Sequence, residues 1–237
     1  MAGVSATKFL LFTIGAVYVL EIILSHGQAL SFGNGIPTKT AFEMGGLFPP
    51  AVAGVPPFGD PQYWRLFTAM FLHANLLHIA FNAWALWIFG NFVELTFGTP
   101  RMLLIYFVTG LFASATSYTF GPVIQLGLGA SGAIVGLLGA FIAYNFRRRR
   151  SAVAQGYIRW AIMIIVINVL WASLYPGIDN WAHGGGLVSG FAAGIAAEGI
   201  GTGESKRVSR WIGFVIIIVI GVAMVVLRTQ SLQNQVS

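Results

Sequence analysis

The chain has 237 residues, of which 57% are hydrophobic and only 8% carry a charged side chain. Soluble domains carry about 25% charged residues, so this composition excludes an ordinary soluble protein and indicates a chain that faces lipid. The sequence contains no cysteine, which excludes disulfides, thiolate metal sites and cysteine nucleophiles.

Apolar segments of about the length that crosses a bilayer run through the whole chain. They predict an all-α polytopic membrane helix bundle. Residues 1–8 lack a small-residue cleavage site after the first apolar run, so we expect that run to be retained as the first helix rather than removed as a signal peptide. The seven predicted segments are 9–24, 76–93, 102–120, 131–146, 160–174, 181–197 and 211–227.

The connection between the first two segments, residues 25–75, is much longer than the others. It holds six of the nine prolines, which forbid one continuous helix. It also carries several large apolar residues, among them Phe48, Val52, Phe58 and Trp64, and is too apolar for a solvated linker. We therefore expect a membrane-associated loop that packs on the helix bundle.

The basic residues predict the orientation of the chain. With the N-terminus in the cytoplasm, ten of the 13 Lys and Arg residues lie inside, as the positive-inside rule requires. The run Arg147–Arg150 follows the end of an apolar segment, so we interpret it as an anchor on anionic membrane lipid and not as a nucleic-acid site. The inside residues are Lys8, Arg101, Arg147, Arg148, Arg149, Arg150, Arg159, Lys206, Arg207 and Arg210.

Three segments that run from outside to inside carry a polar residue near the outer end: His78, Ser131 and His183. Each lies 15 or 16 residues before the first charged residue at the inner end, which corresponds to about 22–24 Å of helix. All three should therefore lie at one depth, about 6–8 Å below the outer boundary of a core about 30 Å thick. A hydroxyl and two imidazoles at one level are the parts of a nucleophilic hydrolase. Asn82, one helical turn after His78, adds a donor on the same face.

Small residues accompany these polar residues. Gly132 and Gly136 follow Ser131, and Gly186 and Gly190 follow His183 on about the same helix face. Small residues spaced by four allow membrane helices to approach closely. Taken singly, each residue has an ordinary structural interpretation, such as a serine bonded to its own helix or a packing glycine. Their combination favours a site between the two helices.

In this combination the sequence resembles the rhomboid family of intramembrane serine proteases, over about residues 8–200. The resemblance implies a six-transmembrane rhomboid-like core in residues 1–200, followed in residues 201–237 by a linker and an additional C-terminal transmembrane helix. The matching residues are Trp64, Arg65, His73, His78, Asn82, Glu94, Gly98, Gly129, Ala130, Ser131, Gly132, Ala182, His183, Gly186 and Gly190.

The resemblance implies a specific chemistry. Ser131 would attack a peptide carbonyl and His183 would act as base and acid, in a dyad without aspartate. His78, Asn82 and the backbone N–H of Ser131 would hold the oxyanion. The substrates would be single-pass transmembrane proteins, cut near the outer membrane face next to small residues, and segment 174–181 with the fifth helix would gate their entry. No cofactor and no metal are expected.

Other residues are expected to support the fold. Glu94 should tie down the loop before the third helix, and His73 should be structural. Asp179 lies on the wrong side of 180–182 to be a triad member. Many rhomboid proteases carry a tyrosine four residues after the nucleophile, where this chain has Val135, so the support of the His183 ring must come from elsewhere.

Two alternatives belong to other classes. One is a non-catalytic rhomboid-like protein that binds transmembrane clients, although such proteins usually lack the serine or the histidine. The other is a transporter, against which no acidic residue lies at mid-membrane, since Glu21 is near the outer end of the first helix. We expect an integral protein of a bacterial inner membrane, with the N-terminus in the cytoplasm and the active site open to the outer side.

Overall fold

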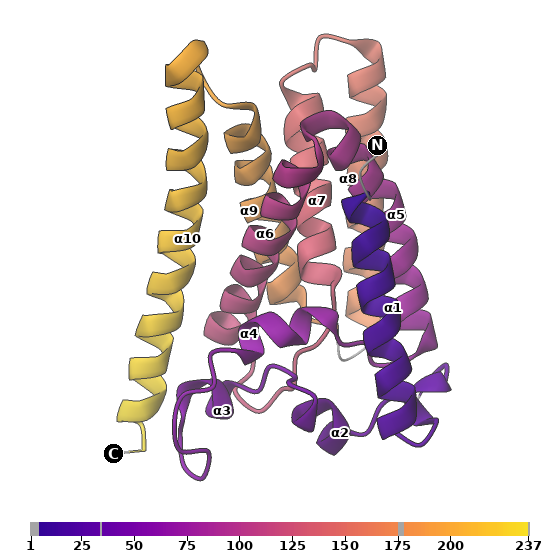
Figure 1. The fold of residues 1–237 in the computed structure, drawn as a ribbon, viewed down its shortest axis with the longest axis vertical. Coiled ribbons are helices and arrows are strands. Elements are labelled where there is room, and N and C mark those ends of the chain that lie inside the picture. Colours follow the sequence, from indigo (N-terminus) through magenta and orange to yellow (C-terminus); the bar gives the residue numbers. More distant parts are fainter. Residues whose placement is uncertain (1–4, 34, 175–177, 237) are drawn as a thin grey trace.

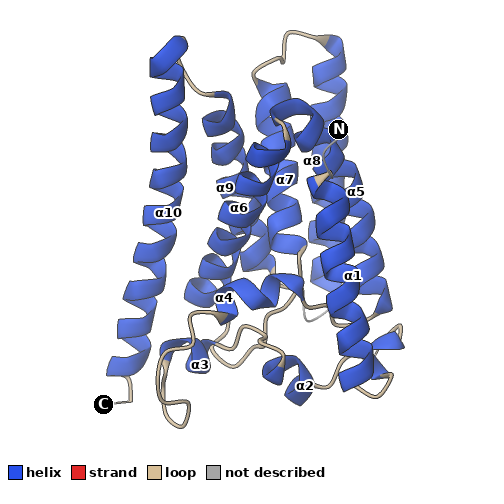
Figure 2. Ribbon diagram, in the orientation of Figure 1, coloured by secondary structure: helices blue, strands red, loops and turns tan. Residues whose placement is uncertain are grey.

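The structure is a computed structural model that describes residues 5–33, 35–174 and 178–236. It is an all-α polytopic membrane helix bundle, as predicted, in which seven long helices run nearly parallel within the described ranges (Figures 1 and 2). The N-terminus and the C-terminus lie at opposite ends of the bundle (Figure 1). The long helices are α1 (Ala6–Leu24), α5 (Leu76–Phe97), α6 (Thr99–Phe120), α7 (Ser131–Phe146), α8 (Ala152–Leu174), α9 (Asn180–Glu198) and α10 (Gly203–Asn234).

Each of the seven predicted segments corresponds to one of these helices. By length and composition, five of the described helices can cross a membrane: α1, α5, α6, α8 and α10. Of the other two, α7 has only 16 residues and is largely buried, whereas α9 keeps one exposed stripe that includes Trp181 and Val188. These two central helices pack against each other more extensively than any other pair. Because neighbours cover most of α7 and the inner face of α9, the two helices can be shorter or richer in glycine than a helix that faces lipid.

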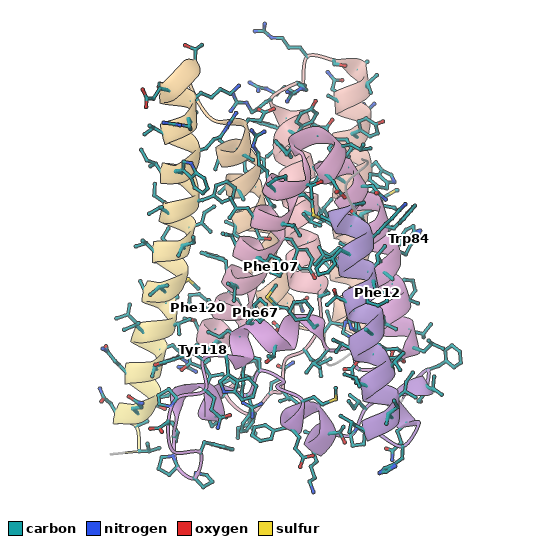
Figure 3. All side chains as sticks on the ribbon, in the orientation of Figure 1. Phe12, Phe67, Trp84, Phe107, Tyr118 and Phe120 are labelled. Atoms are coloured by element: carbon teal, nitrogen blue, oxygen red, sulfur yellow. The ribbon has the colours of Figure 1, made fainter. Side chains whose placement is uncertain are left out.

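The lateral surface of the bundle is apolar. Phe12 on α1 is 76% exposed, and Trp84 on α5 is 61% exposed. Both side chains point away from the bundle (Figure 3). Phe67 of the first loop stacks on Phe107 of α6 with the ring centroids 5.9 Å apart and is itself 44% exposed. An exposed apolar surface of this extent is expected of a protein whose surroundings are lipid tails.

The long first loop crosses one end of the bundle, at the bottom of Figure 1. As its prolines predict, it holds only short helices. Leu47, Val52, Ala53, Leu66 and Ala69 of this loop form one apolar cluster with Tyr118 of α6 and Leu232 of α10, so the loop packs on the bundle. The short helices are η1 (Gln28–Leu30), α2 (Thr38–Glu43), α3 (Pro49–Ala53), α4 (Arg65–Thr68) and η2 (Ala69–Phe71).

Glycines allow α7 and α9 to approach until their backbones touch. A Cβ built on Gly186 would overlap the carbonyl of Gly132, and one on Gly190 would overlap the carbonyl of Gly136. On the other side of α7, a Cβ on Gly132 would lie 2.7 Å from Cβ of Ala113 in α6. Real Cβ atoms do not approach this closely, so larger residues at these positions would push the helices apart.

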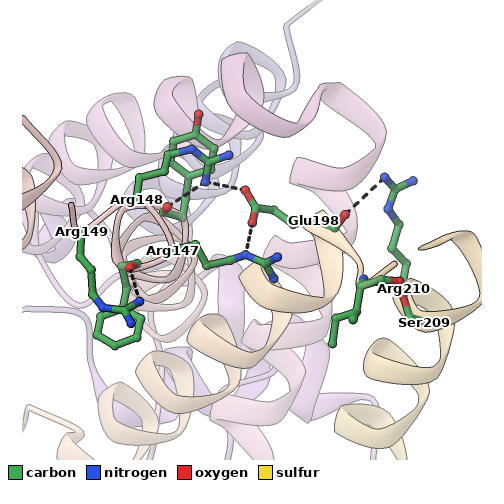
Figure 4. A network of polar contacts seen from close by, with 9 residues as sticks. Arg147, Arg148, Arg149, Glu198, Ser209 and Arg210 are labelled. Atoms are coloured by element: carbon green, nitrogen blue, oxygen red, sulfur yellow. Dashed lines mark hydrogen bonds and ion pairs between the residues drawn. The ribbon is translucent and has the colours of Figure 1, made fainter. Parts of the chain in front are cut away.

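The opposite end of the bundle is held by Glu198, the last residue of α9. Its carboxylate accepts from Arg147 and Arg148 at 2.6 Å each, and its backbone carbonyl accepts from Arg210 of α10 at 3.5 Å (Figure 4). One carboxylate thus ties the ends of α7 and α9 together. The side chain of Glu198 is only 14% exposed, so this pair is stronger than a fully solvated ion pair.

Segment 174–181, expected to gate substrate entry, includes residues 175–177, which lie outside the described residues. The division of the chain at residue 200 stays a prediction.

Candidate active site

Ser131 and His183 meet where α7 and α9 begin. Ser131 is the first residue of α7, and His183 lies in the first turn of α9. The start of α9 is fixed by Asp179, whose carboxylate caps the helix by accepting the N–H of Ala182 at 2.9 Å. Nε2 of His183 and Oγ of Ser131 lie 2.8 Å apart, a hydrogen-bond distance. A serine hydroxyl paired in this way with an imidazole can lose its proton to the ring nitrogen.

His78 faces the same small space as Ser131. Gly129 has a φ of +135°, a backbone conformation that favours glycine. A Cβ built on Gly129 would lie 2.9 Å from Nε2 of His78 and 3.5 Å from Oγ of Ser131. The absence of a side chain at Gly129 therefore leaves room beside the hydroxyl, and the imidazole of His78 borders that room. The N–H of Gly129 donates to the carbonyl of Ala69 at 2.8 Å and so holds the loop on η2.

The hydrogen bonds of His78 assign its tautomer. Its Nδ1 accepts the backbone N–H of Ala74 at 3.2 Å. In a neutral imidazole one nitrogen accepts and the other donates, so the ring hydrogen belongs on Nε2. The N–H bond of Nε2 is thus directed at the space beside Ser131 and Gly129. The backbone of His78 is fixed as well, because its N–H donates to Oδ1 of Asn75, the N-cap of α5, at 2.9 Å.

Asn82 lies one turn further along α5 and is only 6% exposed. Its Nδ2 has no hydrogen-bond partner within the described ranges of the chain. A buried donor without a partner costs about 1–3 kcal/mol unless water or another molecule supplies an acceptor.

The ring of His183 has little support from its own chain. Val135, four residues after Ser131, has no aromatic ring that could stack on the imidazole. Nδ1 of His183 forms no hydrogen bond with any described residue. The carboxylate of Asp179 accepts instead from Ala182 and from the hydroxyl of Ser117 in α6. Asp179 therefore orients the start of the helix that carries His183.

His73 lies next to His78, with the two ring centroids 5.2 Å apart. Its side chain is fully buried, and burial together with the neighbouring His78 lowers the pKa of His73 from 6.5 to about 3. His73 is therefore neutral at physiological pH. Its Nδ1 lies 3.2 Å from the carbonyl of Phe71, an arrangement that holds the turn before α5.

The remaining predicted residues lie away from the hydroxyl. The guanidinium of Arg65 is buried and donates to the carbonyls of Phe42 at 2.7 Å and Gly46 at 3.0 Å, within the first loop. Trp64 packs on that guanidinium at 4.6 Å. Glu94 lies near the other end of the bundle, where it accepts from Thr99 at 2.8 Å and from the first residues of α1.

Two contacts beside the site were not predicted from the sequence, Ser117 to Asp179 and Ala74 to His78. The tie of Glu94 to the start of α1, at the other end of the bundle, was not predicted either. The sequence carries a signal only for a neighbouring contact: Asp179, three residues before Ala182, fits an N-cap pattern and accepts the N–H of Ala182. Among the residues that the structure describes, no group of three or more His, Cys, Asp or Glu side chains could hold a metal ion.

A family model, Rhomboid domain, matches residues 60–198 of the chain. Among curated proteins, Rhomboid protease GluP of Bacillus subtilis is 41% identical over 135 residues, which cover 57% of this chain and 26% of that protein. RHOMBOID-like protein 6, mitochondrial, of Arabidopsis thaliana is 40% identical over 137 residues, which cover 56% of this chain and 43% of that protein.

A longer match involves RHOMBOID-like protein 2 of Arabidopsis thaliana, which is 32% identical over 183 residues, 73% of this chain and 57% of that protein. The chain thus spans between about a quarter and three fifths of the length of these three relatives. The family model covers the first loop from residue 60, the paired histidine and serine, and the glycines between α7 and α9. This chain belongs to the rhomboid family.

Proposed function

We propose that the protein is an intramembrane serine endopeptidase that cleaves transmembrane protein substrates with a Ser131–His183 dyad. The observation that carries the proposal is the 2.8 Å pair of Oγ of Ser131 and Nε2 of His183, with the Nε2–H of His78 directed at the same space. A nucleophile, its base and an oxyanion donor are thereby in reach of one reacting carbonyl.

The geometry fits a two-step acyl transfer. His183 takes the proton of Ser131 as its Oγ bonds to the peptide carbonyl carbon, and the carbonyl oxygen becomes an oxyanion. His183 then gives that proton to the leaving amine as the C–N bond breaks, which leaves an acyl ester on Ser131. Water, deprotonated by His183, hydrolyses the ester and frees the serine.

Three donors are proposed for the oxyanion. The backbone N–H of Ser131 has no partner in its own helix because Ser131 is the first residue of α7. His78 offers its Nε2–H, and Asn82 offers the unpartnered Nδ2. Fixed donors of this kind stabilise the charge that develops in the transition state.

The substrates proposed are single-pass transmembrane proteins cut near the outer membrane face, next to small residues. Support for lateral entry comes from α8, in which Ala161 is buried whereas Ile167 and Val169 nearer the site are 54% and 60% exposed. The half of α8 at the level of the site thus covers little of the bundle, and a substrate helix can approach there. One curated relative carries the printed name of a rhomboid protease.

The proposed location is a bacterial inner membrane, with the N-terminus in the cytoplasm and the site open to the outer side. In support, Arg147–Arg150 and the start of α10 lie at the same end of the bundle as the N-terminus, and the first loop lies at the other (Figure 1). Basic residues retained on the cytoplasmic side and in contact with anionic lipid would give this orientation.

One assay tests the proposal. Purified protein in lipid is incubated with a labelled single-pass substrate and, separately, with a fluorophosphonate probe. We expect cleavage and a covalent adduct on Ser131, both lost in Ser131→Ala and largely lost in His183→Ala. Ser189→Ala is the matched control, since the hydroxyl of Ser189 bonds only carbonyls of its own helix, at 2.7 and 3.2 Å.

The outcomes are distinct. An adduct on another residue, or one that forms equally well without His183, would rule out the Ser131–His183 dyad. Capture of the substrate without cleavage and without an adduct would instead support a non-catalytic protein that binds transmembrane clients.

A further inference from the structure

Glu21 is a buried acid that the proposed chemistry does not use. It lies near the end of α1 at the level of the first loop, and its side chain is fully buried. A carboxyl group in such surroundings is unfavourable unless its hydrogen bonds are made. An apolar side chain at this position of α1 would avoid the cost of burying a carboxyl group, which suggests that Glu21 has a specific role.

One oxygen of Glu21 bonds the turn that precedes α5. Its Oε1 accepts the backbone N–H of His73 at 2.7 Å. The next N–H along the chain, that of Ala74, donates to Nδ1 of His78 at 3.2 Å. Two successive backbone N–H groups therefore point at Glu21 and at the imidazole of His78. On its other side the carbonyl of Ala74 accepts the N–H of Ile36 at 2.7 Å.

These contacts link Glu21 to His78, the proposed donor to the oxyanion. The bond from Ala74 keeps Nδ1 of His78 without a hydrogen, which places the ring hydrogen on Nε2, toward Ser131. If the peptide between His73 and Ala74 rotates, that N–H is lost and the imidazole can take the other tautomer, with an acceptor where the oxyanion needs a donor. Glu21 holds the preceding peptide, between Leu72 and His73, because the N–H that it accepts is that of His73. It thereby fixes one side of the turn from which the N–H of Ala74 projects toward His78.

We propose that Glu21 is a positioning residue for catalysis: through the His73–Ala74 turn it holds His78 in the tautomer that donates to the oxyanion. It touches no substrate and acts only through His78. The inference rests on the proposed proteolytic function and adds Glu21 to the residues that this function uses.

A purely structural role would look different. If Glu21 only fastens the first loop to α1, its loss lowers stability whatever residue occupies position 78. If it acts through His78, its loss has no further effect once the imidazole is gone. Tyr18, one turn earlier on α1, gives a matched control, because its hydroxyl also bonds the first loop, but at the carbonyl of Ala29 and not at the His73–Ala74 turn.

The experiment compares Glu21→Leu, Glu21→Gln and Tyr18→Phe in wild-type and His78→Ala backgrounds, in lipid, with the transmembrane substrate. Glutamine keeps the oxygen that accepts from His73, so we expect its kcat within about threefold of wild type. We expect Glu21→Leu to lower kcat by about 10–100-fold with KM unchanged, since a donor present only in the transition state is misplaced. In the His78→Ala background, Glu21→Leu should cost less than about twofold more.

Three results overturn the inference: equal losses in Glu21→Gln and Glu21→Leu, losses that multiply with His78→Ala, or a loss in Tyr18→Phe as large as in Glu21→Leu. A spectroscopic measurement does not depend on cleavage or on the stability of a variant. In ¹⁵N-histidine NMR of the wild-type protein, Nε2 of His78 should be the protonated nitrogen, and a hydrogen on Nδ1 would contradict the inference. Failure of the wild type to cleave or to label Ser131 would count against the proposed function instead.

Discussion

Gly190 of α9 lies against Gly136 of α7 so closely that a Cβ on Gly190 would overlap the Gly136 carbonyl. Gly186 has the same relationship with Gly132, one turn nearer the site. The helices that carry Ser131 and His183 are therefore in direct backbone contact, and the 2.8 Å hydrogen bond between these two side chains depends on that contact.

The first prediction concerns this distance. Gly186→Leu, and to a lesser degree Gly186→Ala, should part α7 and α9, lower the cleavage rate by at least tenfold and destabilise the bundle by about 1–3 kcal/mol or more through overpacking. No catalytic atom is changed. Gly184→Ala is the control, since a Cβ on Gly184 meets nothing within 4 Å. The cleavage rate and the melting temperature of the three variants, measured in the same detergent, test this prediction. Full activity in Gly186→Leu would contradict the packing argument.

Much of this arrangement could be predicted from sequence because it follows from helix geometry alone. A fixed rise per residue placed His78, Ser131 and His183 at one depth, and glycine spacing indicated which faces of α7 and α9 touch. Contacts between distant segments could not be predicted in this way. The bond from Ser117 to Asp179 joins residues 62 apart, and its existence depends on how α6 and α9 are rotated about their axes.

Segment length and composition predicted the membrane-spanning helices less well at the centre of the bundle. A hydropathy pattern assumes lipid around every helix, whereas α7 is largely buried and α9 faces other helices on most of its surface. The environment of Glu94 was also predicted only in part. Its loop partner Thr99 is five residues away, but its partners Ser5 and Thr7 are 89 and 87 residues away.

The second prediction concerns Glu94. Its carboxylate accepts from Ser5, from the N–H groups of Ala6 and Thr7, and from the hydroxyls of Thr7 and Thr99. Glu94→Ala should leave these donors unpaired and lower the free energy of unfolding by about 1–3 kcal/mol, as expected for hydrogen bonds to a charged group that is partly buried.

Glu94 lies far from the hydroxyl, so kcat of the folded Glu94→Ala protein should stay within about twofold of wild type. Glu43→Ala removes an acid whose side chain is 60% exposed and serves as the control, with little effect on stability. A thermal unfolding series in detergent gives the comparison. Unchanged stability in Glu94→Ala would show that the donors find other partners.

The third prediction concerns orientation. A cysteine at Ser205, at the start of α10, should label only from the cytoplasmic side, and one at Ser231, near the end of α10, only from the outside. The native chain has no cysteine, so single-cysteine labelling has no background. Labelling of Ser205→Cys from outside, or of Ser231→Cys only from inside, would reverse the proposed topology.

The fourth prediction separates the donors of the oxyanion. Asn82→Ala should lower kcat by about 10²–10³, the usual loss when one oxyanion donor is removed, with little change in KM because the donor acts in the transition state. Some activity should remain, since the other two donors are still in place. Labelling of Ser131 should persist at a lower rate. The control is Asn145→Ala on α7, a buried asparagine whose Nδ2 bonds the carbonyl of Phe141 in its own helix at 2.9 Å. Equal losses in both variants would mean that the amide of Asn82 acts through packing.

The fifth prediction concerns the seventh helix. The far end of α10 bonds both the first loop and α6. Nε2 of Gln233 donates to the carbonyl of Ala53 at 2.8 Å, and the hydroxyl of Thr229 lies 2.8 Å from that of Tyr118. Leu232 belongs to the apolar cluster of the loop. Since this loop bonds the residues before Ser131, α10 should stabilise the loop and, through it, the nucleophile.

We therefore expect Thr229→Val combined with Gln233→Ala to loosen the first loop. Each lost hydrogen bond should cost about 1 kcal/mol, and amide exchange should rise in α3 before it rises in α7. The matched control is Gln230→Ala, since Gln230 is exposed on the same turn of α10.

Hydrogen-exchange mass spectrometry of the wild type, the double variant and the control makes the comparison, with the cleavage rate measured in parallel. Because the carbonyl of Ala69 and the backbone of Leu47 hold the loop before Ser131 at 2.8 Å, faster exchange in α3 should accompany slower cleavage. If exchange rises equally throughout the bundle, α10 supports the fold as a whole and has no selective effect on the loop.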